Sequence, residues 1–212
     1  SFDDRTGKQL DYHTCNPGYK NKKLYTISQI KKFKPFMHAM CVKTDLIKDK
    51  IKITENCFYT DTEFVLKTIT KVQTILFYDK VIYCYRRASE NQSMSLNGLE
   101  KHYLDQDKVI RELLTYENVF QTSVSMIFDD LLFGTCMWHY LVMLYLKPSI
   151  AHRRYLIAFD TMLKEQALDY YVRTDIGTIQ KLRKTKFMGY SVAAPLKKRK
   201  DGRFTRDGRM IF

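Results

Sequence analysis

Helical periodicity of apolar residues dominates the chain after Asn97-Gly98 and limits what this part can fold into. In segment 99–117, one helical face carries Leu99, Tyr103, Ile110, Leu113 and Leu114. Segment 151–172 repeats the pattern at Tyr155, Phe159, Met162, Leu163 and Tyr170. Apolar side chains three or four positions apart share one face of an α-helix. Residues 98–195 are therefore predicted to form a mainly α-helical C-terminal region whose helices pack on one another, with a helix start after Pro148.

The first part of the chain, residues 1–97, has a mixed pattern. Segment 74–87 predicts two short strands around Tyr78-Asp79-Lys80, because apolar and polar residues alternate in the second of them. Segment 39–47 fits either a short strand or the start of a helix. The expected fold class is thus mixed α and β for 1–97, followed by a mainly helical region.

Two carboxylates stand where a helix is predicted to begin. Helical spacing over 61–72 predicts a helix with Asp61 or Thr62 as its N-cap. Asp61 and Glu63 then fit simple helix capping and the helix dipole. They fit equally a pair of carboxylates presented for acid–base chemistry.

The apolar segment 131–146 raises the question of a membrane. Its length falls short of the roughly 20 residues that a spanning helix needs, and Asp129-Asp130 precede it. A buried core helix is therefore favoured over a membrane span. A helix lying at a membrane interface stays open as the alternative, since Trp138 suits either place.

The net charge of +13 is concentrated toward the two ends of the chain. Lys plus Arg against Asp plus Glu gives 17 minus 10 for residues 1–97, 12 minus 11 for 98–195, and 7 minus 2 for 196–212. Such basic clusters attract the phosphates of nucleic acid, anionic lipid or a sugar nucleotide, or form a solvated surface. The tail, 196–212, is predicted to be flexible.

Cysteine usage indicates a reducing compartment. The five cysteines are odd in number and lack metal-site spacing. We expect reduced thiols in a cytoplasmic protein, which can be peripheral to the inner face of the membrane.

Three segments carry a resemblance to a known family. In order, they are "PFMHAMCVKTDLI" at 35–47, "ITENCFYTDTEFVLKTI" at 53–69 and "VIYCYRRASENQSMS" at 81–95. Together they resemble the acceptor-side half, here residues 1–97, of the GT-A domain of a bacterial family 2 glycosyltransferase. The resemblance implies inverting transfer of a sugar from a nucleotide-sugar donor to a saccharide or lipid-linked acceptor in surface polysaccharide synthesis.

The resemblance also implies roles for individual residues. Asp61 would be the general base, with Glu63 as second choice, and Thr60 stands where the family often has another acidic residue. The implied substrate-binding residues are His38, Arg86, Arg87, Gln92 and Ser93. Arginine suits a diphosphate because its paired donors match the phosphate oxygens.

The resemblance covers only part of the family's catalytic domain. A divalent metal, Mg or Mn, is expected only in the complete enzyme, whose donor half carries an Asp-x-Asp motif. Residues 1–212 are accordingly expected to be a fragment that is inactive alone. A rival hypothesis is a non-catalytic basic module that binds nucleic acid or the inner membrane surface.

Overall fold

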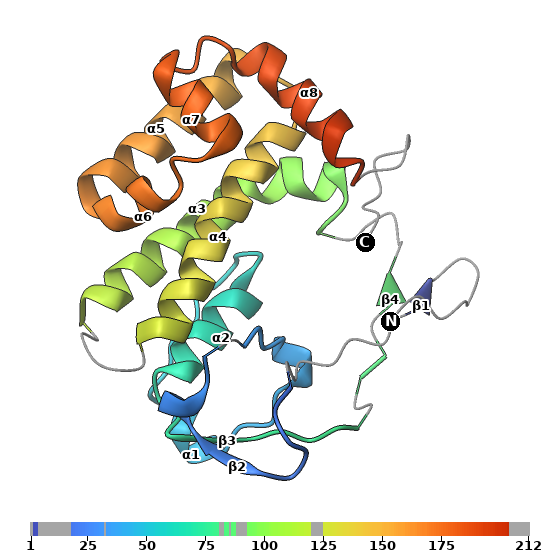
Figure 1. Ribbon diagram of the computed structural model, residues 1–212, viewed down its shortest axis with the longest axis vertical. Coiled ribbons are helices and arrows are strands. Elements are labelled where there is room, and N and C mark those ends of the chain that lie inside the picture. Colours follow the sequence, from blue (N-terminus) through green and yellow to red (C-terminus); the bar gives the residue numbers. More distant parts are fainter. Residues whose placement is uncertain are drawn as a thin grey trace. The chain divides into compact units, whose positions relative to one another are not determined.

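The computed structural model describes residues 2–3, 18–31, 33–80, 83–84, 86–87, 93–119 and 125–203. The described chain is mostly helical, with a small antiparallel pair of strands (Figure 1). It divides into two compact units. Unit 1 comprises Ser1–Ala88 and Arg111–Leu132, and unit 2 comprises Ser89–Ile110 and Phe133–Phe212. Helices α3 (Leu96–Val119) and α4 (Ser125–Tyr145) each contribute one part to each unit.

Unit 1 is built from short elements around one helix. Its elements are β1 (Phe2–Asp3), β2 (Leu24–Thr26), η1 (Ile27–Gln29), η2 (Met37–Ala39), α1 (Thr44–Ile47), α2 (Thr60–Ile69), β3 (Thr74–Leu76) and β4 (Arg86–Arg87). Strands β2 and β3 are antiparallel, with Leu24 opposite Leu76. Strands β1 and β4 are parallel, with Phe2 opposite Arg86.

The core of unit 1 forms around α2. Residues 65–69 of this helix are all buried, so the helix is enclosed on most sides. An aromatic cluster lies against β3, where Phe77 is stacked on Tyr19 with ring centroids 4.7 Å apart and meets Tyr25 and Phe33 edge-on. Such aromatic contacts bury large apolar areas and thereby stabilise a unit with little sheet.

Unit 2 is a set of packed helices. Besides parts of α3 and α4 it contains α5 (Ile150–Gln166), α6 (Leu168–Arg173), α7 (Gly177–Lys184) and α8 (Tyr190–Asp201). The Ser149 hydroxyl caps α5 by accepting a hydrogen bond from the His152 amide, directly after Pro148. A break at Ala167 separates α5 from α6 within the predicted run 151–172. The expectation of a mainly helical C-terminal region is confirmed.

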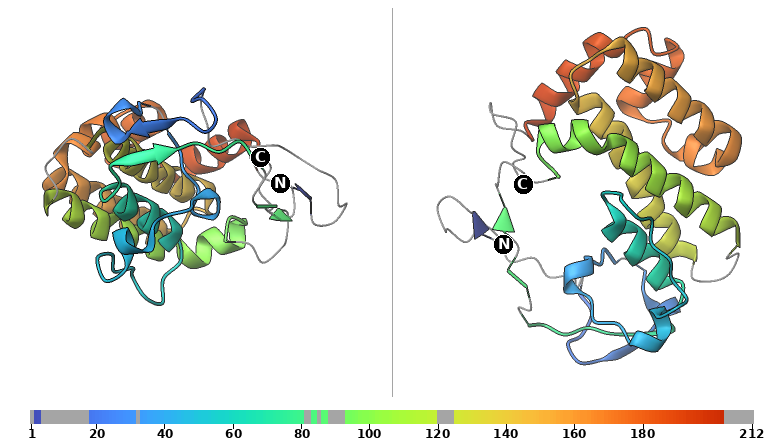
Figure 2. Two further views of the ribbon diagram at one scale, coloured as in Figure 1. Left: turned by 90° about the horizontal axis from the view of Figure 1, so that it is seen from below. Right: turned by 180° about the vertical axis from the view of Figure 1, so that it is seen from behind.

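Helix α4, yellow in Figure 2, contributes buried side chains to unit 2. Residues 142–146 are all buried, and the His139 ring is fully buried between the Gln106 side chain and the Tyr155 hydroxyl. Of the described helices, Met126–Tyr145 alone is long and apolar enough to cross a membrane by length and composition, with half of it buried in the protein. This burial supports the core-helix interpretation of 131–146.

Three local predictions differ from the structure. The N-cap of α2 is Tyr59, so the prediction of Asp61 or Thr62 as N-cap is wrong. Of the predicted strands in 74–87, the described residues form β3 and β4, while residues 81, 82 and 85 lie outside the described part. Residues 196–201, expected to be flexible, continue α8, which ends at Gly202 in the left-handed conformation. The rest of the predicted tail after residue 203 lies outside the described residues.

Candidate functional site

The site begins with the first turn of α2. Tyr59 precedes the helix with φ 64°, a left-handed conformation that costs a bulky residue about 1–2 kcal/mol. Its side chain forms no capping hydrogen bond. Strained backbone of this kind persists only where its surroundings hold it, and it gathers at functional sites. The turn that follows carries both predicted catalytic carboxylates, Asp61 and Glu63.

Asp61 and Glu63 have opposite environments. Asp61 is exposed, and among the described residues it forms no hydrogen bond or ion pair. Glu63 is completely buried. Because successive positions on a helix point in different directions, two carboxylates of one turn are separated into a solvent-facing and a core-facing group.

The Glu63 carboxylate is held by two groups of unit 1, one on its own helix and one in the preceding loop. It accepts a hydrogen bond from the Lys67 ammonium at 2.6 Å and from the backbone amide of Thr54 at 3.1 Å. The same ammonium donates to the Lys52 carbonyl at 2.9 Å and to the Glu112 carboxylate at 2.8 Å. All three ammonium donors are therefore used, as burial of a charged group requires.

The buried cluster has a structural role. Desolvation alone would lower the pKa of Lys67, but hydrogen bonds to Glu112 and Glu63 outweigh it and raise the pKa above its ordinary value. Lys67 therefore stays charged and compensates the buried Glu63. Glu63 joins α2 to the segment around Thr54 and cannot reach a substrate hydroxyl. This leaves Asp61 as the exposed carboxylate of the turn.

His38 lies close to Asp61 in unit 1. Element η2, which carries His38, packs against α2. Partial burial lowers the pKa of His38 from its ordinary value, and the nearby Asp61 carboxylate opposes this shift. The sequence prediction placed these two residues in one site, and they lie within electrostatic range of each other.

The His38 ring is part of an aromatic patch with Phe36 and Tyr83. Phe36 stacks on it with a centroid distance of 5.4 Å and an interplanar angle of 12°. Tyr83 meets its ring at 4.8 Å and 35°. Phe36 is 47% exposed and Tyr83 is 53% exposed, so the patch faces solvent. Sequence reasoning missed Phe36 and Tyr83 as site residues, although both lie in the segments that carry the resemblance.

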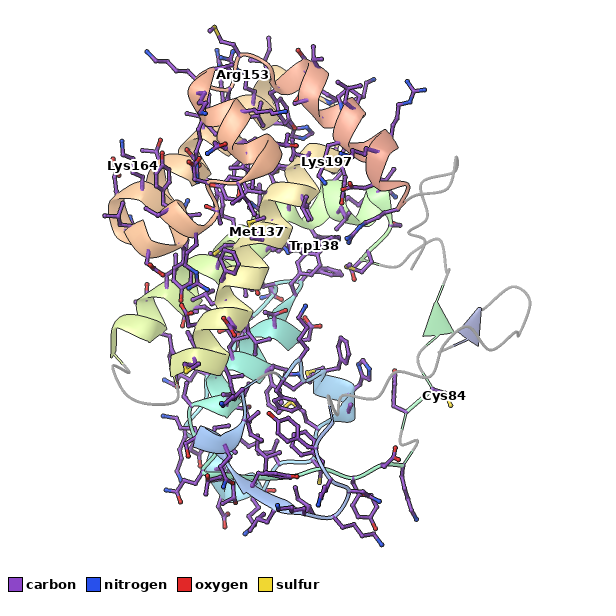
Figure 3. The ribbon with its side chains drawn as sticks, in the orientation of Figure 1. Cys84, Met137, Trp138, Arg153, Lys164 and Lys197 are labelled. Atoms are coloured by element: carbon purple, nitrogen blue, oxygen red, sulfur yellow. The ribbon has the colours of Figure 1, made fainter. Side chains whose placement is uncertain are left out.

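The other predicted binding residues are placed only in part. Arg86 and Arg87 form β4 beside β1, and their side chains lie outside the described part. Cys84, just before them, is exposed and labelled in Figure 3. Gln92 lies outside the described residues. Ser93 is described in a turn before α3 and belongs to unit 2.

A metal ion has no evident binding group in the described part of the chain. There, no three His, Cys, Asp or Glu side chains are grouped as metal ligands. Mg²⁺ and Mn²⁺ bind oxygen ligands, and Mg²⁺ is often held by one or two carboxylates together with substrate phosphates. The chemistry considered below is derived from the described side chains alone.

Chemically, the exposed site combines a proton acceptor with a flat apolar surface. A carboxylate in water-accessible surroundings can take a proton from a hydroxyl that is held within hydrogen-bond distance. Aromatic faces carry partial negative charge and attract the polarised C–H groups of a bound molecule. The aromatic patch beside Asp61 is thus suited to position an uncharged hydroxylated ligand. Comparisons with protein-family models, curated proteins and solved structures found no match.

Proposed function

We propose that the protein is an inverting glycosyltransferase of the family 2 type, with residues 1–97 forming the acceptor-side half of a GT-A domain. The observation that carries the proposal is the proximity of exposed Asp61 to His38, whose ring belongs to the aromatic patch. Asp61 and His38 come from two of the three segments that resemble the family, and Tyr83 comes from the third. The proposed reaction moves a sugar from a nucleotide-sugar donor to a saccharide or lipid-linked acceptor in surface polysaccharide synthesis.

Asp61 is the general base of the proposed reaction. Its carboxylate takes the proton of the acceptor hydroxyl while the hydroxyl oxygen forms a bond to the anomeric carbon of the donor. The bond from that carbon to the diphosphate oxygen breaks, and its electron pair leaves with the nucleoside diphosphate. Attack from the opposite side inverts the anomeric configuration. A positioned base of this kind contributes about 10²–10⁴-fold to the rate.

The aromatic patch binds the acceptor in this proposal. One face of a sugar ring presents C–H groups, which pack on the Phe36, His38 and Tyr83 rings while a hydroxyl points at Asp61. The resemblance assigns Arg86 and Arg87 to the departing diphosphate, and Gln92 and Ser93 to substrate binding. It also implies a divalent metal for the complete enzyme.

The test is transfer activity of the protein as its gene encodes it. Purified protein is incubated with nucleotide sugars and oligosaccharide acceptors, and the Asp61→Asn variant is compared with it. Loss of about 100-fold or more in kcat at unchanged donor affinity is expected. Asp45→Asn serves as the matched control, because Asp45 is also an exposed aspartate in the first turn of a helix, α1.

Acceptor binding is tested separately by replacing Tyr83 with Ala. This variant is expected to raise the KM for the acceptor about tenfold, with a smaller change in kcat, since the ring only positions the sugar. Turnover that survives in Asp61→Asn would remove Asp61 as the base. A protein that transfers no sugar from any donor would remove the proposed function itself.

A further inference from the structure

The outer face of α8 combines exposed apolar side chains with cations. Met188, Val192 and Leu196 follow one another at intervals of four and are 71%, 63% and 59% exposed. Residues four apart in a helix are neighbours on its surface, so Val192 and Leu196 form one continuous apolar row that Met188 precedes. We call these three residues the apolar row.

A cationic end follows the apolar row on the same helix. Arg199, Lys200 and Arg203 are all exposed. Among the described residues, Arg199 and Lys200 form no ion pair. Asp201 is the single carboxylate between residues 177 and 203, and it is turned toward the core of unit 2. The outer face of α8 therefore carries positive charge, with no exposed carboxylate of the helix itself beside it.

The inner face of α8 contacts the rest of unit 2 near both ends of the helix. The Tyr190 hydroxyl donates to the Met143 carbonyl at 2.6 Å, and the Tyr145 hydroxyl donates to Asp201 at 2.7 Å. Lys197, labelled on α8 in Figure 3, donates to the same Asp201 carboxylate at 2.7 Å. Both ends of the helix are thus anchored, and the outer face is held in one orientation.

The turn before α8 is also fixed in place. Arg153, labelled in Figure 3, donates from Nε to the Phe187 carbonyl at 2.9 Å. It also donates from Nη2 to the Lys186 carbonyl at 3.4 Å. Met188 follows these two anchored residues, so its exposed side chain belongs to an ordered turn.

We infer that the outer face of α8 is a docking surface for a membrane that contains anionic lipid. Cations in a last helical turn also stabilise the helix dipole, so charge alone does not identify the ligand. The apolar row favours lipid as the ligand. Aliphatic and thioether side chains can enter the headgroup region of a membrane while neighbouring cations bind lipid phosphates. A nucleic acid would use the cations but leave the apolar row in water. This inference does not depend on the proposed transfer activity.

The inference places membrane contact on a different helix from the one that hydropathy singles out. Apolar helix α4 is the longer and more hydrophobic of the two, but residues 142–146 are enclosed in unit 2. Helix α8, by contrast, exposes the apolar row and neighbouring cations together on one outer face. Membrane binding is therefore predicted to be peripheral and reversible.

The experiment measures sedimentation of the full 212-residue chain with vesicles. Strong binding is expected to vesicles of phosphatidylcholine mixed equally with phosphatidylglycerol, and weak binding to phosphatidylcholine alone. Arg199→Gln with Lys200→Gln is expected to weaken binding about 30-fold, since each cation near an anionic surface contributes about 1 kcal/mol. Lys108→Gln with Lys164→Gln is the control, because it removes two exposed cations from other helices of unit 2.

A second pair of variants tests the apolar row. Val192→Gln with Leu196→Gln is expected to weaken binding about tenfold, because two apolar side chains no longer enter the lipid. Leu168→Gln with Val172→Gln is the matched control, with both residues 60% exposed at the same spacing on α6. Circular dichroism establishes that all four variants fold as the parent does.

Three outcomes would overturn the inference. The first is equal binding of the α8 variants and their controls. The second is equal binding to the two kinds of vesicle. The third is tight binding of a single-stranded oligonucleotide that the charge variant weakens, together with vesicle binding that the Val192→Gln and Leu196→Gln variant leaves unchanged. That result would assign the face to a polyphosphate ligand.

Discussion

The Lys67 ammonium lies 2.6 Å from the Glu63 carboxylate, one helical turn away in α2, with side chains 4% and 0% exposed. Removal of one partner from a buried ion pair leaves an uncompensated charge in the core. Lys67→Met is therefore expected to lower the free energy of unfolding by about 3–5 kcal/mol. Urea unfolding followed by circular dichroism measures this loss.

Two further variants separate the pair from its surroundings. Replacing Glu63 and Lys67 together by Met is expected to cost less than Lys67→Met alone, because no buried charge is left unpaired. Glu112→Gln is expected to cost about 1 kcal/mol or less, since that side chain is 47% exposed. If Lys67→Met were no more damaging than Glu112→Gln, the pair would not be buried as described.

His38 is expected to titrate below its ordinary value of 6.5. Burial disfavours its protonated form, while the Asp61 carboxylate partly restores it. Asp61→Asn removes the restoring charge and should lower the pKa of His38 further. Proton NMR of the imidazole C–H signals as a function of pH measures both values.

The control for this titration is His102, which pairs with Asp105 at 2.9 Å in unit 2. Its imidazole signals should be unaffected by Asp61→Asn, because His102 lies in the other unit. A His38 pKa that is unchanged by Asp61→Asn would show that the two side chains are too far apart to share a site. The proposed acceptor site would then lose its main support.

Arg183 is the centre of a second buried network, in unit 2. It donates to Asp160 at 2.8 Å, to Thr174 at 3.0 Å and to the Tyr140 hydroxyl at 3.1 Å, and its guanidinium stacks on the Tyr171 ring. Asp160→Asn removes the negative partner of this buried cation. We expect a loss of about 3 kcal/mol in the free energy of unfolding.

Asp169→Asn is the matched control for Asp160→Asn. Asp169 also pairs with an arginine, Arg173, at 3.2 Å, but its side chain is 76% exposed. Exposed pairs of this kind contribute about 0.3–0.5 kcal/mol. Thermal unfolding of both variants should therefore show a large shift for Asp160→Asn and almost none for Asp169→Asn.

How far the sequence predicts this molecule depends on whether a feature is local or tertiary. The helical periodicity of 99–117 and 151–172 is local, and helices occupy both segments. The break at Ala167 is not visible in that periodicity, because apolar residues recur on both sides of it. Likewise, Gly202 marks the end of α8, but the two glycines and alternating charge suggested a flexible tail from residue 196.

The candidate site shows the same division. Glu63 and Lys67 four positions apart are the usual pattern of an exposed helical ion pair. Their burial depends on Glu112 and Thr54, which are distant in sequence. The left-handed conformation of Tyr59 could not be predicted from the sequence either, because tyrosine is not a residue type that favours positive φ. Asp61 and His38 were predicted as site residues from the resemblance to a family and not from periodicity, and that prediction remains one.

Stability is expected to fall at alkaline pH. Desolvation by burial raises the pKa of Tyr140 and Tyr190 well above the ordinary value of 10.0. The pKa of Lys67 is also raised, because desolvation, which lowers it, is outweighed by the hydrogen bonds to Glu112 and Glu63. The unfolded chain therefore loses protons near pH 10 that the folded chain keeps. The contribution of these groups to the free energy of unfolding is fully present below about pH 10 and is lost as the pH rises further.

Urea unfolding between about pH 8 and pH 11 measures this loss. Tyr190→Phe is expected to make the decline shallower, at the cost of the hydrogen bond to the Met143 carbonyl. The control is Tyr78→Phe, since Tyr78 is 53% exposed and should leave the slope unchanged. A free energy of unfolding that stayed constant through pH 11 would contradict the burial of these hydroxyls.

Two exposed lysines of unit 2 are expected to respond oppositely to the same substitution. Lys186 has φ 49°, a left-handed conformation that costs a non-glycine residue about 1–2 kcal/mol. Lys186→Gly relieves this strain but adds freedom to the unfolded chain, so a net gain of about 0.5–1 kcal/mol is expected. Lys181 lies within α7, where glycine is expected to cost about 1 kcal/mol. Thermal unfolding of the two variants should shift the melting temperature in opposite directions, and a loss in both would contradict the left-handed backbone between α7 and α8.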